Sequence, residues 1–230
     1  IPKIRGRQRS RKMEDIVREA RRLAKEGVRE LILIAQDTGE YGTDLYGERK
    51  LAELLILLDQ IEELRWIRLL YVYPETIDDK LIAVMANAKR ILPYIDIPFQ
   101  HISDAVLRKM GRMTDSLSIH QLIATLRESI PEIVIRSTFI VGFPQETKDD
   151  IQELADFLRE SRLDRVGVFR YSKEEGTPAA EMDGQISEEE KQRRYDELMS
   201  IQEAVSDSVL EKYQDIELDA VVEEEIEPSI

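Results

Sequence analysis

Short apolar runs alternate five times with amphipathic helical patterns along most of this 230-residue chain. The apolar runs predict strands at residues 31–35, 66–73, 94–101, 132–144 and 165–172. The amphipathic patterns predict helices at residues 12–27, 50–64, 76–88, 103–110, 116–129 and 147–161. Strands that alternate with helices need crossover connections, which favour a parallel sheet. We therefore expect an α/β fold with its helices packed outside the sheet.

The number of repeats favours a partial barrel. Eight strand–helix units close a full barrel, whereas five strands are visible and the chain opens on a loop that feeds a helix. One further strand before Ile1 would give six units, a partial (β/α)6 barrel whose first strand lies outside this chain. An open, doubly wound sheet is the rival arrangement, and periodicity does not exclude it.

The last part of the chain, from Ser187 onwards, departs from the alternation of strands and helices. Ser187 is expected to begin a long helix that reaches about Tyr213. The segment after it, DIELDAVVEEEIEPSI, first alternates like a strand and then becomes acidic. We expect two units, a barrel with its C-terminal helix at 1–213 and the first strand of a small β domain at 214–230.

Charge and composition exclude several classes of protein. Lys and Arg number 33 and Asp and Glu 47, which gives a net charge of −14. This charge argues against non-specific binding to nucleic acid or to an anionic membrane. There is neither a transmembrane-length apolar run nor a signal-peptide pattern, so a cytoplasmic location is expected. Cysteine is absent, so no thiolate metal site is expected within these residues.

The first residues carry a local exception to this acidity. Positive side chains occupy every second position at Lys3, Arg5, Arg7, Arg9 and Arg11. Such a cationic segment is suited to an anionic cofactor, acidic protein or RNA surface. A solvated lead-in to the first helix is an equally good interpretation.

The ends of the predicted strands carry the candidate chemistry. Ligands of parallel α/β folds collect at the C-terminal ends of the strands. Polar or turn-forming stretches follow the predicted strands at QDT, YP, PFQH, GFPQET and YS. Each stretch also suits an ordinary turn or helix cap. Arg136 differs, because it sits inside an apolar strand and needs an anionic partner, either a ligand or the carboxylate of Asp96.

Several stretches together carry a family resemblance. They are IPKIRGRQRSR, LIAQDTGEYGTDLYG, YVYP, ILPYIDIPFQH, RSTFIVGFPQET and LDRVGVFRYSKEEGTPA. In this order and spacing, they resemble the radical-SAM methylthiotransferases over nearly the whole chain. The QDT-x-x-YG-x-D, YVYP and FRYSKEEGT stretches resemble most the branch that modifies an aspartate of a small-subunit ribosomal protein. The resemblance implies that this chain starts just after a Cys-x3-Cys-x2-Cys loop that holds a [4Fe–4S] cluster.

The resemblance also implies a chemistry and its participants. S-adenosylmethionine would be reduced at the cluster, a hydrogen would leave the β-carbon of the target aspartate, and a methylthio group would take its place. A second [4Fe–4S] cluster and an electron donor are implied, as is a ribosomal-protein substrate, either free or on the ribosome. Residues 214–230 resemble the opening of a TRAM domain, through which alone nucleic acid would be bound. The cysteine-free chain by itself is expected to be inactive.

The resemblance assigns S-adenosylmethionine contacts but no catalytic residue. The implied cofactor-binding residues are Gln36, Asp37, Gln100, His101, Arg136, Val141, Gly142 and Tyr171. Gln36 and Asp37 would meet the methionine amino group, Gln100 and His101 the ribose, and Arg136 the methionine carboxylate. Val141 and Gly142 would pack on adenine, and Tyr171 would flank the base. One departure is Gln145, where the family usually has glycine, so that turn uses ordinary dihedral angles or is strained.

Three other functions stay open at this point. They are a tRNA-modifying methylthiotransferase, a non-catalytic barrel that docks on the ribosome, and a barrel enzyme acting on a phosphorylated metabolite. We expect Gln36, Gln100, Arg136 and Gly142 to border one cleft at the C-terminal edge of the sheet. We also expect Ile1 to lie beside the mouth of that cleft.

Overall fold

The computed structural model describes residues 6–222, and its strands are all parallel. In this part of the chain β1 (Glu30–Leu33) pairs with β2 (Trp66–Leu69). A second group holds β3 (Tyr94–Gln100), β4 (Val134–Val141) and β5 (Arg165–Arg170), in that order. The spatial order follows the chain order, which confirms the predicted partial barrel and rules out a doubly wound sheet.

The two groups of strands join along one line between β2 and β3. Ile67 forms an isolated parallel bridge with Ile91. Two hydrogen bonds support it, from the Ile67 N–H to the Arg90 carbonyl at 2.7 Å and from the Leu92 N–H to the Ile67 carbonyl at 2.9 Å. Further along, the Val72 N–H donates to the Asp96 carbonyl at 2.9 Å. The five strands therefore form one curved wall with a weaker junction inside it.

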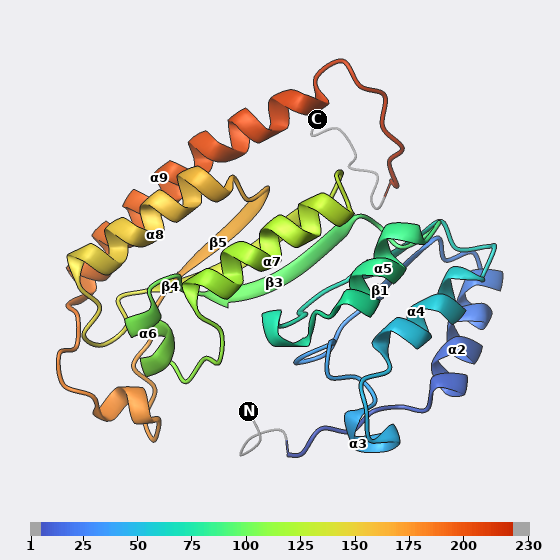
Figure 1. Cartoon of the computed structure of the whole chain (residues 1–230), viewed down its shortest axis with the longest axis horizontal. Helices are drawn as coiled ribbons and strands as arrows, with labels where there is room; N and C mark the ends of the chain where they lie inside the picture. The colour runs from blue at the N-terminus through green and yellow to red at the C-terminus, as the bar shows by residue number, and fades with distance from the viewer. Residues whose placement is uncertain (1–5, 223–230) are drawn as a thin grey trace, which may run out of the picture.

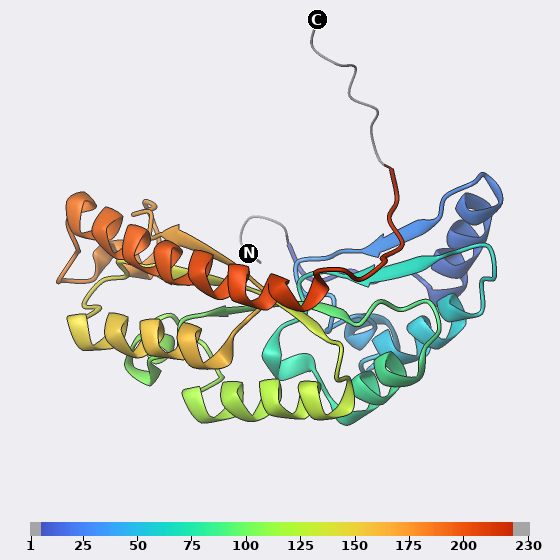
Figure 2. The same cartoon turned by 90° about the horizontal axis from the view of Figure 1, so that it is seen from above.

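Helices cover the convex side of this wall (Figures 1 and 2). The α-helices are α2 (Met13–Lys25), α3 (Thr43–Tyr46), α4 (Leu51–Asp59), α5 (Asp79–Asn87), α6 (Asp104–Lys109), α7 (Ser116–Ser129), α8 (Lys148–Ser161) and α9 (Glu188–Leu210). Three 3₁₀ turns complete the described elements, η1 (Pro74–Thr76), η2 (Pro178–Glu181) and η3 (Glu211–Tyr213). The long α9 runs beside β5 and α8, and so covers the last strand.

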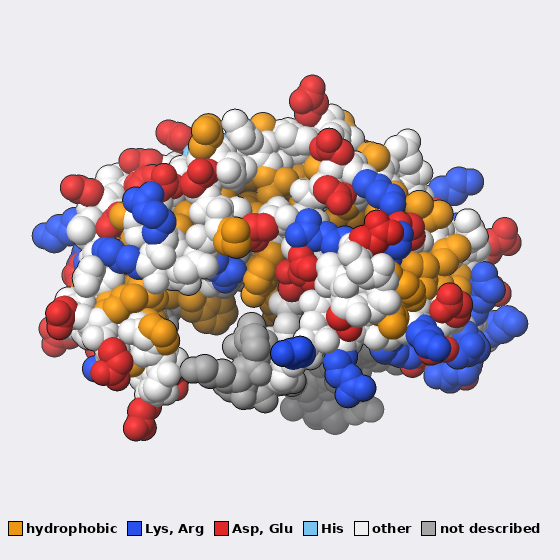
Figure 3. Space-filling model, turned by 60° about the horizontal axis from the view of Figure 1, so that its bottom comes forward, with side chains coloured by type: hydrophobic (Ala, Val, Ile, Leu, Met, Phe, Trp, Pro, Cys, Tyr) orange, Lys and Arg blue, Asp and Glu red, His pale blue; other side chains and the backbone are white. Residues whose placement is uncertain are grey.

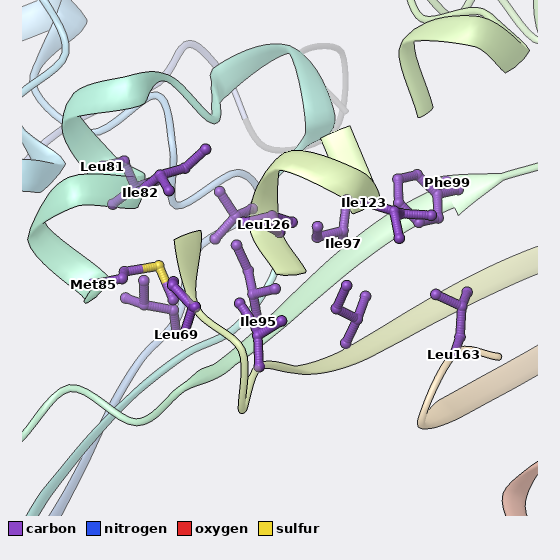
Figure 4. Close-up of a cluster of buried hydrophobic side chains, with 14 of the residues drawn as sticks. Leu69, Leu81, Ile82, Met85, Ile95, Ile97, Phe99, Ile123, Leu126 and Leu163 are labelled. Carbon is purple, nitrogen blue, oxygen red and sulfur yellow. The ribbon is translucent and has the colours of Figure 1, made fainter. Parts of the chain in front are cut away.

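The hydrophobic core lies between the sheet and the outer helices. Figure 4 shows Ile95 and Ile97 of β3 packed towards Leu81, Met85 and Leu126 of α5 and α7. Strand β4 shows which face of the sheet is buried. Its residues alternate between buried and half-buried along its whole length, with the buried ones on the helix-covered face. The concave face is open in comparison, with Ile32 49% and Phe169 57% exposed.

Most predicted boundaries are close to those observed, with informative differences. Helix α8 begins one residue after the predicted start, and a capping box fixes it there, since Thr147 and Asp150 cap each other reciprocally. Helix α5 is capped by Asp78 and starts at Asp79, not at residue 76 as predicted, because Thr76 belongs to η1. Residues 214–222 contain no strand, and 223–230 lie outside the described residues. The expected β domain at 214–230 therefore stays a prediction.

All the connections that leave the strands gather at one edge. The segments with α3, η1, α6 and η2 follow β1, β2, β3 and β5 and lie at the bottom of Figure 1. Figure 3 looks onto this side and shows a central hollow with hydrophobic side chains in its floor and charged side chains around it. This edge is the place where a parallel α/β fold binds its ligands.

Candidate cofactor site

Backbone conformation marks the C-terminal edge as unusual. Tyr71 after β2, Gln100 at the end of β3 and Gln145 after β4 are non-glycine residues with φ of 55°, 73° and 62°. Gly142, at the end of β4, has φ of 76°. Non-glycine residues seldom adopt this left-handed region, and strained backbone clusters at binding sites. The strain supports a functional role for this edge.

Asp37 ties the loop after β1 to the end of β2. Its Oδ1 accepts hydrogen bonds from the Gly39 N–H at 3.0 Å and the Tyr73 N–H at 3.4 Å. Burial raises the pKa of Asp37, although these two donors oppose the rise. Gln36, next to it, is exposed and unengaged in side-chain hydrogen bonds among the described residues. Of the two residues, Gln36 is thus the one whose side chain can reach a ligand.

The two predicted residues at the end of β3 differ in accessibility. Gln100 is half-buried beside an irregularity in the β3–β4 pairing. His101 is completely buried, and its Nδ1 accepts a hydrogen bond from the Ser103 N–H at 2.9 Å. Burial lowers the pKa of His101 to about 4, so the ring is neutral at pH 7 and its hydrogen sits on Nε2. His101 therefore supports the site from behind instead of touching a ligand.

Glu146 anchors the turn that follows β4. Its carboxylate accepts hydrogen bonds from the Gly142 N–H at 2.9 Å and from Arg194 Nη1 of α9 at 2.6 Å. His101 Nε2 lies 3.6 Å from the same carboxylate. Burial raises the pKa of Glu146, against the effect of these donors. The hydrogen bonds from Gly142, Phe143 and Arg194 favour the ionised form of this buried carboxylate, whereas His101 Nε2 has no hydrogen-bond partner in the described structure.

Gly142 and Tyr171 share a neighbour in α9, the buried Lys191. A Cβ atom on Gly142 would lie 2.3 Å from Lys191 Cγ, so only glycine fits beneath this side chain. The Lys191 ammonium lies 5.2 Å from the centre of the Tyr171 ring. Tyr171 also contacts Phe143 edge-on at 5.3 Å, and its N–H donates to the Val141 carbonyl.

The structure gives Arg136 the protein partner that the sequence left open. Arg136 Nη1 lies 2.9 Å from Asp96 Oδ1, on the neighbouring strand. The Arg136 side chain is 38% exposed, whereas that of Asp96 is 1% exposed. The contact is an ion pair but lacks hydrogen-bond geometry, since both Asp96 carboxylate oxygens have no hydrogen-bond partner in the described structure. Arg136 is the third residue of β4, well before the strand end.

The predicted residues therefore separate into groups. Gly142, His101 and Tyr171 belong to one cluster at the ends of β3, β4 and β5. Val141 joins that cluster through its backbone, but its side chain is buried on the helix-covered face. Gln36 and Asp37 follow β1, in the other group of strands. A cleft shared by Gln36, Gln100, Arg136 and Gly142 stays a prediction.

Part of the cationic segment is described, and it runs along the same edge. The Ser10 N–H donates to Asp44 Oδ2 at 2.8 Å, and Tyr41 donates its hydroxyl to the Arg11 carbonyl at 2.9 Å. These bonds hold the segment against the loop after β1. Arg11 also forms an ion pair with Glu19 of α2 at 2.7 Å. The predicted position of Ile1 lies outside the described residues, as do Lys3 and Arg5.

Sequence reasoning missed the contribution of α9. Its buried residues are Lys191, Arg194, Leu198, Gln202, Val205 and Val209. They recur every three or four positions, which is the spacing of one helix face. Lys191 and Arg194 lie on this inward-facing stripe, and charged residues that are buried need partners. That pattern is a usable sequence signal for a buried polar contact.

Comparison with known proteins identifies the class. The Radical SAM superfamily profile matches residues 1–158, more than half of the chain. The chain therefore belongs to the radical SAM superfamily. Membership implies S-adenosylmethionine and an iron–sulfur cluster as cofactors.

Two curated relatives are similar over nearly the whole chain. The chain is 54% identical over 224 residues to the ribosomal protein uS12 methylthiotransferase RimO of Clostridium botulinum, covering 97% of this chain and 50% of that protein. It is 46% identical to the protein of the same name from Clostridioides difficile, over 100% of this chain and 52% of that protein. The chain thus spans about half the length of these relatives.

Solved structures agree on the fold. Escherichia coli coproporphyrinogen III oxidase, HemN, described as a radical SAM enzyme, superposes with a TM-score of 0.57 at 19% identity, over 91% of this chain and 49% of that one. Streptococcus suis SuiB bound to S-adenosylmethionine gives 0.55 at 17% identity, over 89% and 42%. At this identity, the similarity concerns the fold alone.

The residues present fit one implied cofactor and not the other. The Tyr171 hydroxyl is buried without a hydrogen-bond partner in the described structure, beside an aromatic ring and a strand end, which suits a nucleoside. The chain contains no cysteine, and residues 6–222 hold no group of three His, Asp or Glu side chains arranged for a metal. These residues therefore suit S-adenosylmethionine but do not supply the ligands of an iron–sulfur cluster.

Proposed function

We propose that this chain is the barrel of a methylthiotransferase that modifies ribosomal protein uS12, at the β-carbon of an aspartate. The observation that carries the proposal is 46–54% identity, over at least nine-tenths of the chain, to relatives that bear this name. The parallel partial barrel is compatible with it. The same identities favour this substrate over tRNA and favour an enzyme over a docking module.

The chain's own contribution is to bind and orient S-adenosylmethionine. The cofactor would supply the oxidising equivalent for hydrogen removal and the methyl group. Tyr171 and the Gly142 turn would hold its nucleoside part, and the exposed Gln36 amide would meet its methionine part. Gln100, at the end of β3, would contact the ribose between these two parts. Arg136, whose Nη1 faces Asp96, would offer its remaining guanidinium N–H groups to the methionine carboxylate.

The remaining participants belong to the same proposal. The cluster would need ligands that these residues do not supply and an electron donor, and the reaction would take place in the cytoplasm, with uS12 free or on the ribosome. A TRAM-like domain beginning at residue 214 would contact nucleic acid. None of the described helices combines the length and the apolar character needed to cross a membrane.

The test uses the full-length protein, reconstituted anaerobically with iron and sulfide. It is incubated with a reductant, S-adenosylmethionine and either purified uS12 or unmodified tRNA. The expected result is the mass increase of uS12 that corresponds to exchange of one hydrogen for a methylthio group, on an aspartate located by peptide fragmentation. Modification of tRNA instead would support the second substrate class. Modification of neither, with cluster and cofactor bound, would support a docking module.

A further inference from the structure

The first turns of α9 converge on the end of β4. Lys191 and Arg194 are one turn apart and both are buried, at 2% and 4% exposure. The stem of Lys191 packs under Gly142, and Arg194 binds Glu146, which in turn binds the Gly142 N–H. Helix α9 therefore reaches the same glycine by two independent routes.

The second route is strongly built. Arg194 donates to the Glu146 carboxylate at 2.6 Å, to the Glu146 carbonyl at 3.1 Å and to Glu190 at 2.8 Å. The Glu146 carboxylate also accepts a longer hydrogen bond from the Phe143 N–H, at 3.4 Å. One guanidinium thus holds both ends of the turn between Gly142 and Glu146.

The first route also involves the candidate base-flanking residue. The Lys191 ammonium lies over the Tyr171 ring and forms an ion pair with Glu188 at 2.6 Å. Lys191 thereby fixes the space below Gly142 and occupies one face of the Tyr171 ring.

We propose that Lys191 and Arg194 are positioning residues, through which α9 holds the Gly142 turn and Tyr171 in the arrangement that binds the adenosine part of the cofactor. The inference rests on the proposed function, because it assigns these two groups to the nucleoside. It goes beyond it by making a helix outside residues 1–158, the part matched by the superfamily profile, responsible for cofactor affinity. Neither side chain has to touch the ligand.

The test measures binding of S-adenosylhomocysteine and of 5′-deoxyadenosine to the full-length protein by calorimetry. Arg194→Met should weaken both ligands by about tenfold or more, because the turn loses its anchor. Lys191→Ala should weaken both more than Lys191→Met, which keeps the stem. The matched control is Arg193→Met, since Arg193 is exposed on the same helix and pairs only with Glu190 and Glu197 in the described structure. It should leave both affinities within about twofold of wild type.

A double variant separates a loss of positioning from a loss of folded protein. Arg194→Met leaves a buried carboxylate without its cation, whereas the double variant Glu146→Gln, Arg194→Met removes that charge and keeps an acceptor for Gly142. The double variant should regain stability and part of the affinity. In turnover assays, KM for S-adenosylmethionine should rise while kcat stays nearly constant, whereas a loss of folded protein would lower kcat alone.

The outcomes separate the two proposals. Unchanged dissociation constants in Arg194→Met and Lys191→Ala, with a wild-type protein that binds both ligands, would overturn the positioning role and leave the function intact. Failure of the reconstituted wild-type protein to bind S-adenosylhomocysteine would overturn the proposed function, and the inference with it.

Discussion

Asp96 and Arg136 face each other across β3 and β4, and their charged atoms approach to 2.9 Å on the concave side of the sheet. Asp96 is almost fully buried, while Arg136 keeps over a third of its side chain in solvent. The pair thus consists of a trapped anion and a cation that is free to move. This asymmetry makes the two residues unequal in their effect on stability.

Replacing Arg136 should cost more than replacing its partner. Arg136→Met leaves a buried carboxylate unpaired and should lower the free energy of unfolding by about 1–3 kcal/mol, the upper values being reduced by the exposure of the arginine. Asp96→Asn should cost less, because the released guanidinium is solvated. Urea denaturation of both variants and of the double variant measures the coupling. Equal losses of unfolding free energy in the two single variants would contradict the conclusion that the buried Asp96 depends more on its partner than Arg136 does.

His101 should make stability depend on pH in a defined window. Its pKa is lowered to about 4 in the folded protein by burial, against about 6.5 when unfolded. The unfolded chain therefore binds more protons between these values, and this contribution to stability is complete above pH 6.5 and lost as the pH falls towards 4. The effect should reach about 3 kcal/mol near pH 4.

The measurement compares wild type with His101→Gln in urea titrations from pH 7 to pH 4. The stability difference between the two proteins should shrink as the pH falls, since the variant has no imidazole to protonate. The chain's other histidine is the matched control, because His120 is exposed and its ring lies nearly perpendicular to that of Phe157. A pH profile for His101→Gln that is parallel to that of wild type would show that His101 is not the group responsible.

Gln145→Gly should stabilise the protein. The left-handed conformation of Gln145, with φ of 62°, costs a side-chain-bearing residue about 1–2 kcal/mol, while glycine adds about 0.5–1 kcal/mol of unfolded-state entropy. The net gain should be about 0.5–1 kcal/mol in the free energy of unfolding. Gln145→Val should be destabilising, because a β-branched residue tolerates this φ least. A lower urea midpoint for Gln145→Gly would mean that the Gln145 contacts with Gly184 outweigh the strain.

Gly142→Ala should be strongly destabilising, by at least about 2 kcal/mol, because positive φ and a steric overlap act together. Its Cβ would meet the Lys191 stem at 2.3 Å. Shortening that stem in Gly142→Ala, Lys191→Ala should recover part of the loss, leaving the cost of φ. Thermal unfolding of the single and double variants tests this. If the stability losses of the two single variants simply add in the double variant, the Cβ introduced by Gly142→Ala does not overlap with the Lys191 stem.

The fold was predictable because its signals are local. The α8 capping box at Thr147 and Asp150 is written in four consecutive residues, and the alternation of strands and helices sets the strand order. Strand ends were less predictable, because pairing decides them. β2 ends at Leu69 and not at Tyr73 as predicted. Leu69 is the last residue of β2 that pairs with β1, and Tyr71, two residues later, has a positive φ.

The candidate site was predictable in position but not in contacts. Parallel topology alone places His101 and Gly142 at the ligand-binding edge. It does not reveal that His101 is buried behind Glu146, or that Arg194 arrives from 48 residues away. Asp96 was foreseen as one of two partners for Arg136, and only the register of β3 against β4 brings the two together. Long-range polar contacts of this kind depend on packing that no short motif encodes.

The junction between β2 and β3 is the part of the wall with the fewest backbone hydrogen bonds. Among the described residues, backbone hydrogen bonds from Ile67, Leu92 and Val72 cross it, whereas β3 and β4 pair along nearly their whole length. The core side chains of Leu69, Ile95 and Leu126 lie across this line, so packing and not the backbone ladder holds the two groups of strands together there. The amides of Ile67, Val72 and Leu92 should therefore exchange with deuterium before those of the β3–β4 pairing.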